Sequence, residues 1–147
     1  MRLWHKELIK FLPDAQFKGQ LREMVAIMHD WRDKGKTNHL LINRVMEYPK
    51  GELTAYYMHY ENEYMRRYSK FPKGYLAEFM EFCDYLPMCE KGGAVFKGWH
   101  NKEYLSVCVC NLYEKCHFGV GKSKITQSEW DRILQGYKEI TGEDWIL

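Results

Sequence analysis

The sequence lacks any apolar run approaching the about 20 residues that a membrane-spanning helix needs. It also lacks the apolar core of a secretory signal peptide, since Lys6, Glu7 and Lys10 interrupt the first residues. We therefore expect a cytoplasmic protein with no membrane partner, whose five cysteines are mostly thiols. Internal repeats, low-complexity segments and linkers are absent too. Residues 1–147 are thus expected to form a single domain.

The spacings that mark a metal site are also missing. The candidate ligands near the end of the chain are Cys83, Cys89, Cys108, Cys110, Cys116 and His117. None of them forms the usual Cys-x2–4-Cys pair, and no His-Glu-x-x-His pair occurs in the sequence. We expect buried apolar thiols and no metal, and a thiol–metal module remains as an alternative.

A phosphate-binding loop is incomplete as well. The segment GVGKSK at 119–124 resembles the end of such a loop. The full pattern needs a glycine five positions before Gly121, where this chain has Cys116. The segment also follows a predicted helix and not a strand, so a flexible turn is the expected structure.

The composition indicates a folded protein. Apolar residues make up 46% and charged residues 29% of the chain, which excludes a disordered protein. The 11 Tyr, 7 Phe and 5 Trp would suit a packed core and would equally suit stacking against bases. Charge is uneven: residues 1–73 hold 14 Lys/Arg and 9 Asp/Glu, whereas 74–147 hold 8 and 11. An anionic partner on the N-terminal half is therefore permitted.

Helical periodicity covers nearly the whole chain. Apolar residues recur at i, i+3 and i+4 in six segments, 16–35, 38–48, 51–68, 74–86, 101–116 and 126–142. The Val and Cys content of 101–116 would also suit a strand, but its spacing favours a helix. Thr126 and Glu129 form a predicted capping box, and Gly142 is a suitable terminating residue. The expected fold is an all-α, single-domain helical bundle with a loose loop around 90–98.

One position within the first long helix is unusual. Met24, Ile27 and Met28 belong to its apolar stripe, and Glu23 lies at the edge of that stripe. Arg22 points about 100° away from Glu23 and should face water. Glu23 is therefore either a solvated flank of the helix or a carboxylate held near an apolar wall for chemistry.

The start of the chain, MRLWHKELIKFLPDAQFKGQLRE, resembles the pyrimidine-dimer DNA glycosylase family of the phage endonuclease V type. It is similar to bacterial relatives that begin Met-Arg-Leu/Ile-Trp-His and carry Gly-Gln-x-Arg-Glu further on. Arg2-Leu3 and Arg22-Glu23 stand at the matching positions. The similarity is good over about fifty residues and extends weakly over 1–80.

The resemblance implies a role for five residues. The family's nucleophile is the α-amine of the first residue, which is Met1 here, and its catalytic carboxylate corresponds to Glu23. Arg2 and Arg22 correspond to arginines that contact DNA, and Gln16 is the third expected DNA contact. We expect Met1 to be retained because a bulky arginine follows it. Damaged double-stranded DNA with pyrimidine dimers is the implied partner, and no metal or organic cofactor is implied.

The chemistry of an α-amine fits this role. Its pKa is near 8, compared with about 10.4 for lysine, so far more of it is unprotonated at neutral pH. Only the unprotonated amine can form an imine, and the neighbouring positive charge of Arg2 would lower its pKa further. We expect a DNA glycosylase with associated strand-cleaving (AP lyase) activity. The alternative is a non-catalytic helical protein that keeps the fold and binds nucleic acid or protein, with Arg22 and Glu23 as a solvated pair.

Overall fold

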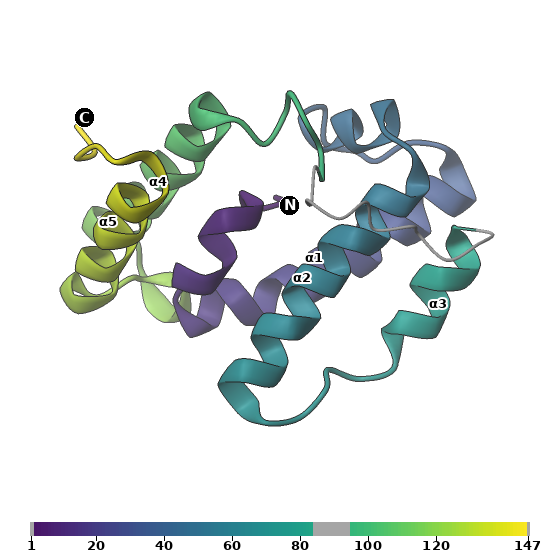
Figure 1. The fold of residues 1–147 in the computed structure, drawn as a ribbon, viewed down its shortest axis with the longest axis horizontal. Coiled ribbons are helices and arrows are strands. Elements are labelled where there is room, and N and C mark those ends of the chain that lie inside the picture. Colours follow the sequence, from purple (N-terminus) through teal and green to yellow (C-terminus); the bar gives the residue numbers. More distant parts are fainter. Residues whose placement is uncertain (1, 84–94, 147) are drawn as a thin grey trace. The chain divides into compact units, whose positions relative to one another are not determined.

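The computed structural model describes residues 2–83 and 95–146, and these residues form helices, turns and loops with no strand among them (Figure 1). The α-helices are α1 (Asp14–Lys34), α2 (Lys50–Tyr68), α3 (Tyr75–Phe82), α4 (Lys102–His117) and α5 (Gln127–Thr141). The described residues also form three short 3₁₀ helices: η1 (Lys6–Phe11) before α1, η2 (Ile42–Glu47) between α1 and α2, and η3 (Gly121–Ser123) between α4 and α5. The predicted all-α fold is confirmed.

Most of the predicted helices are present. α1, α2 and α5 lie where periodicity placed them, and 101–116 is the helix α4 and not a strand. α3 confirms the start of the helix predicted over 74–86, whose last three residues lie outside the described part of the chain. The loop expected around 90–98 is described only from Val95, and both Val95 and Phe96 are buried.

The helix predicted over 38–48 is wrong in extent and in type. Only Ile42–Glu47 is helical there, and it is the 3₁₀ helix η2. The reason is a local competitor for the backbone. The Asn43 side-chain oxygen accepts hydrogen bonds from the Thr37 backbone N–H at 2.8 Å and from its hydroxyl at 3.0 Å. This closes a turn across the residues that would have formed the first turns of the helix.

The chain divides into two compact units, which we describe separately. The first comprises Met1–Leu3 and Gln20–Trp99, and the second comprises Trp4–Gly19 and His100–Leu147. The expectation of a single domain therefore stays a prediction.

Aromatic side chains build the core of the first unit. Tyr56, Tyr57 and Tyr60 of α2 are fully buried, and Tyr57 stacks on Phe79 of α3 with ring centroids 4.6 Å apart. α1 contributes Met24, Ile27 and Met28, all fully buried, which confirms its predicted apolar face. The tyrosines of this region therefore serve packing, which is one of the two uses that the composition left open.

The second unit is built on contacts of α5 with α4 and with η1. Gly136 of α5 allows close approach, since a Cβ atom there would lie 2.4 Å from Cγ of Phe11. The predicted capping box of Thr126 and Glu129 is present, and Gly142 ends the helix at φ 76°. The turn expected at 119–124 contains the single short helix η3.

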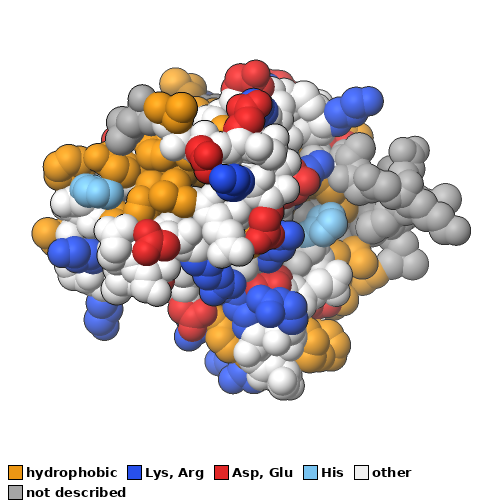
Figure 2. Space-filling view, turned by 60° about the vertical axis from the view of Figure 1, so that its left-hand side comes forward, with side chains coloured by type: hydrophobic (Ala, Val, Ile, Leu, Met, Phe, Trp, Pro, Cys, Tyr) orange, Lys and Arg blue, Asp and Glu red, His pale blue; other side chains and the backbone are white. Residues whose placement is uncertain are grey.

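The surface carries charges of both signs. On the face shown in Figure 2, basic and acidic side chains lie interspersed, and the apolar side chains gather mainly on the left. The large apolar side chains that are most exposed are Leu40, Phe71, Phe118, Val120 and Ile146. Among the helices of the described residues, none combines the length and the apolar character needed to span a membrane.

Candidate active site

The Glu23 carboxylate of α1 binds the beginning of the chain. Its Oε2 atom accepts a hydrogen bond from the backbone N–H of Arg2 at 3.2 Å, within the first unit. The side chain is partly buried, and its neighbour Met24 is fully buried. Glu23 is therefore not a solvated flank of the helix: it is a carboxylate held beside an apolar wall and bound to the N-terminal segment.

A second side chain of α1 binds the same residue. Gln20 is fully buried, and its Nε2 donates to the Arg2 carbonyl oxygen at 2.8 Å and to Glu23 Oε2 at 3.4 Å. Its Oε1 accepts from the hydroxyl of Tyr56 on α2 at 3.1 Å. Arg2 is thus held at both its N–H and its C=O, by two side chains one helical turn apart.

The sequence analysis did not predict Gln20 and Tyr56 as part of the site. One signal could have identified Gln20, because it lies one turn before Glu23 and its position falls on the buried side of α1. A polar side chain at a buried helix position needs hydrogen-bond partners nearby. Nothing in the local pattern distinguishes Tyr56 from the other tyrosines of α2.

The surroundings of Glu23 change its acidity. Burial raises the pKa of the Glu23 carboxyl above its usual value, and the hydrogen bond from the Arg2 N–H lowers it again in part. The positive charges of Arg2 and Arg22 also lower this pKa, and the net shift is upward. A carboxyl group whose pKa is raised towards neutrality is suited to both accept and donate a proton.

The two predicted arginines differ in exposure. Arg2 is partly buried, whereas Arg22 is exposed, as the sequence predicted. Both are close enough for their charges to act on the Glu23 carboxyl. No ion pair of Arg22 occurs within residues 2–83 and 95–146, so its guanidinium can reach a phosphate group without first leaving a carboxylate.

The remaining predicted site residues are Met1 and Gln16. Met1 lies outside the described residues. Gln16 belongs to the second unit, is 8% exposed, and donates through Nε2 to the Ser123 carbonyl at 2.9 Å. Its contact with DNA stays a prediction.

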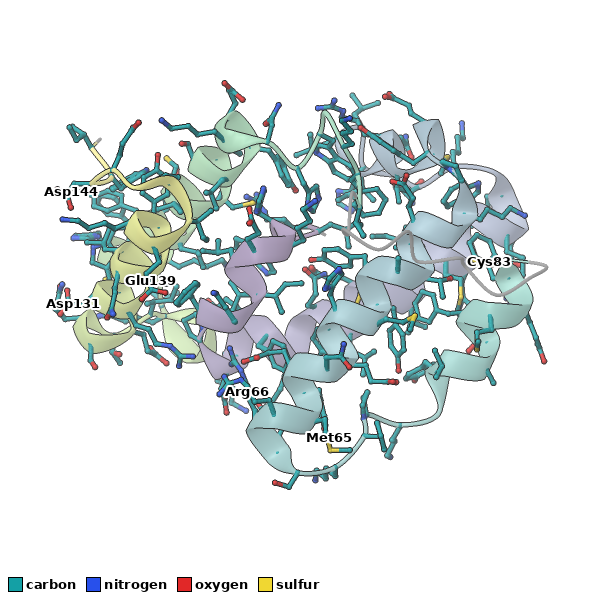
Figure 3. All side chains as sticks on the ribbon, viewed as in Figure 1. Met65, Arg66, Cys83, Asp131, Glu139 and Asp144 are labelled. Carbon is teal, nitrogen blue, oxygen red and sulfur yellow. The ribbon has the colours of Figure 1, made fainter. Side chains whose placement is uncertain are left out.

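The four cysteines that the structure describes differ in burial. Cys83 at the end of α3 (Figure 3) is buried, with its Sγ 2.7 Å from Oγ1 of Thr54. Cys108 is buried in α4. Cys110 is exposed, contrary to expectation, because residues two apart point to opposite sides of a helix. Cys89 lies outside the described part of the chain. Over the part that is described, no group of three or more His, Cys, Asp or Glu could hold a metal ion.

The fold and the site together define an all-helical protein whose first residues are bound to a partly buried carboxyl group beside two arginines. A family model described as pyrimidine dimer DNA glycosylase matches residues 1–74, and the chain belongs to this family. It is therefore a DNA repair protein of the pyrimidine dimer glycosylase kind, and damaged DNA is its partner. No curated protein and no solved structure matches the chain.

Proposed function

We propose that this protein removes damaged pyrimidine bases from duplex DNA and then cleaves the strand at the resulting abasic site, with the α-amine of Met1 as nucleophile. The observation that carries the proposal is the 3.2 Å hydrogen bond from the Arg2 N–H to Glu23. One residue spans at most about 3.6 Å, so bond lengths alone keep the amine of Met1 within about 7 Å of the Glu23 Oε2 atom. A single water molecule can bridge much of that distance.

The reaction begins with the unprotonated amine. Its lone pair attacks C1′ of the damaged nucleotide, and the bond from C1′ to the base nitrogen breaks with its electron pair leaving on the base. The Glu23 carboxylate stabilises the positive charge that develops on the sugar and accepts the proton that the amine loses. The departing base takes a proton from water. As the sugar ring opens, Glu23 returns its proton to O4′, which leaves a protonated imine between the Met1 nitrogen and C1′.

Strand cleavage follows from the imine. A base removes the C2′ proton, the electron pair moves to form the C2′–C3′ double bond, and the 3′ phosphate leaves with the C3′–O bond pair. Glu23 is the group suited to this proton transfer, because its pKa is raised by burial. Hydrolysis of the imine then returns the free amine. Each step uses only this chain, the DNA and water.

The matched half of the chain also fits a DNA partner. Residues 1–73 hold 14 Lys/Arg and 9 Asp/Glu, which favours binding to the phosphate backbone. In this proposal Arg2 and Arg22 bind phosphates beside a nucleotide that is flipped out of the stack. Pyrimidine dimers are the lesion we propose, in line with the family.

Borohydride trapping on duplex DNA with one abasic site tests the proposal without needing the correct lesion. We expect the native chain to form a covalent complex, and a chain with one glycine added before Met1 to lose it, because a displacement of about 1 Å can cost 100-fold. N-terminal sequencing checks that the native chain begins with Met1. Equal trapping by the extended chain would refute the amine mechanism. Duplex binding with no trapping would support the non-catalytic alternative.

A further inference from the structure

The buried amide of Gln20 connects the three groups that hold the site together. It bonds the Arg2 carbonyl, the Glu23 carboxylate and the Tyr56 hydroxyl, and all of these residues belong to the first unit. We propose that Gln20, oriented by Tyr56, is a positioning residue that sets the placement of the Glu23 carboxylate and of the chain's first residues for catalysis. This inference rests on the function proposed above.

The chemistry of the partners determines which way the amide faces. The Arg2 carbonyl can only accept a hydrogen bond, so the NH₂ group of Gln20 must face it. The amide oxygen then faces the Tyr56 hydroxyl, which donates to it at 3.1 Å. The Arg2 carbonyl therefore sets the orientation of the amide, and the hydrogen bond from Tyr56 holds Gln20 in the orientation in which it donates to both Arg2 and Glu23.

An amide is a costly way to fill this space. Gln20 is fully buried, and a methionine of similar length would pack there without losing hydrogen bonds to water. What the amide adds is direction, because its two N–H groups lie in one plane and bind two different acceptors. Glu23 binds the N–H of Arg2 while Gln20 binds its C=O, so the peptide units on both sides of Arg2 are fixed against α1.

Loss of the amide should therefore have two effects. Hydrogen bonding from Gln20 favours the charged form of Glu23, so its removal raises the pKa of the carboxyl further. Release of the Arg2 carbonyl also lets the preceding residue move, and small displacements of a nucleophile lower the reaction rate sharply. A residue that served only packing would produce neither effect.

The experiment compares Gln20→Met, Gln20→Glu and Tyr56→Phe with the native chain. The first readout is the pKa of the Glu23 carboxyl by carbon-13 NMR, and the second is the pH profile of single-turnover cleavage of abasic duplex. For Gln20→Met we expect the Glu23 pKa to rise, the acid limb of the profile to move to higher pH, and the rate to fall at least about 10-fold. Duplex affinity should change less than about twofold.

Gln20→Glu and Tyr56→Phe should shift the Glu23 pKa by different amounts. Gln20→Glu places a second carboxyl beside Glu23, so its pKa shift should be the largest. Tyr56→Phe keeps the ring and removes one hydroxyl, so it should shift the pKa in the same direction by less. The matched control is Gln135→Met on α5, where an exposed glutamine also donates to a glutamate, Glu139, at 3.1 Å. It should change nothing.

The outcomes separate this inference from the function on which it rests. An unchanged Glu23 pKa and acid limb in Gln20→Met would overturn the positioning role, even if stability falls. If Gln20→Met does not fold, Tyr56→Phe decides, and the absence of a shift there overturns the proposal. If the native chain neither traps nor cleaves while the Glu23 pKa still moves in the variants, the proposed function fails and the positioning role is supported.

Discussion

The backbone N–H of Arg2 donates to the carboxylate of Glu23 at 3.2 Å, across 21 positions of sequence. The contact joins the beginning of the chain to helix α1. The accepting group is a carboxyl whose pKa is raised by burial. A carboxylate that both binds the N-terminal segment and can exchange a proton combines positioning with acid–base chemistry. Changes at Glu23 should therefore affect catalysis far more than folding.

Glu23→Gln should leave the fold and duplex binding nearly intact and should stop strand cleavage. The two side chains are close in volume, and the glutamine oxygen can still accept the Arg2 N–H. The negative charge and the proton carrier are lost, so single-turnover cleavage of abasic duplex should fall at least about 100-fold. Glu103→Gln on the exposed start of α4 is the control. Cleavage within a few-fold of the native rate would show that Glu23 is not the proton carrier.

Arg22→Ala should weaken binding to damaged and undamaged duplex by a similar factor. Arg22 is exposed, and a phosphate contact carries no sequence or lesion information. The slope of log affinity against log salt should become shallower by about 0.9, the value for one phosphate contact. Fluorescence anisotropy over a series of salt concentrations measures both quantities. Arg32→Ala serves as comparison, because Arg32 pairs with Asp33 at 2.8 Å. An unchanged slope in Arg22→Ala would mark it as an ordinary surface charge.

Acidification should destabilise the second unit through His5. The His5 ring is 2% exposed, stacks on His100, and accepts the Glu7 N–H through Nδ1 at 3.3 Å. Burial lowers the pKa of His5 below 6.5, while His100 and Glu7 raise it and Lys6 lowers it. Because the folded state binds the proton less readily than the unfolded state, His5's contribution is complete above pH 6.5 and is lost as the pH falls towards the folded-state pKa.

Urea unfolding at pH 7.5 and 5.5 measures this effect. The loss of stability between the two pH values should be smaller in His5→Asn, since asparagine can accept the same capping hydrogen bond without titrating. His39→Asn changes an exposed histidine and should leave the pH dependence as it is in the native chain. A loss as large in His5→Asn as in the native chain would assign the effect to other groups.

Two glycines on helices should respond in opposite ways to alanine. At Gly19 in α1 a Cβ would meet no atom of the described chain within 4 Å, so Gly19→Ala should stabilise by about 0.5–1 kcal/mol through backbone entropy. At Gly136 in α5 the Cβ would lie 2.4 Å from Cγ of Phe11, so Gly136→Ala should destabilise by about 1–3 kcal/mol. Thermal unfolding of both variants measures the difference. Stabilisation by both would show that the η1–α5 contact yields easily.

Local features of the sequence were enough to predict most of the helices. The capping box at Thr126 and Glu129 depends on residues three positions apart, and the apolar face of α1 depends on residues three and four apart. Such interactions are complete within one or two turns. The prediction over 38–48 was wrong for a related reason, because the Asn43 side chain offers the backbone a competing partner that a pattern of apolar residues does not register.

The sequence by itself determined the all-α class, the exposure of Arg22, and the unusual place of Glu23 at the edge of an apolar stripe. Only the tertiary structure decided that Glu23 and Gln20 bind the N–H and the C=O of Arg2, and that the Tyr56 hydroxyl of another helix donates to Gln20. These contacts join positions 2, 20, 23 and 56. Helical periodicity is imposed by local hydrogen bonds, whereas the meeting of distant side chains follows from how whole helices pack, which no short spacing encodes.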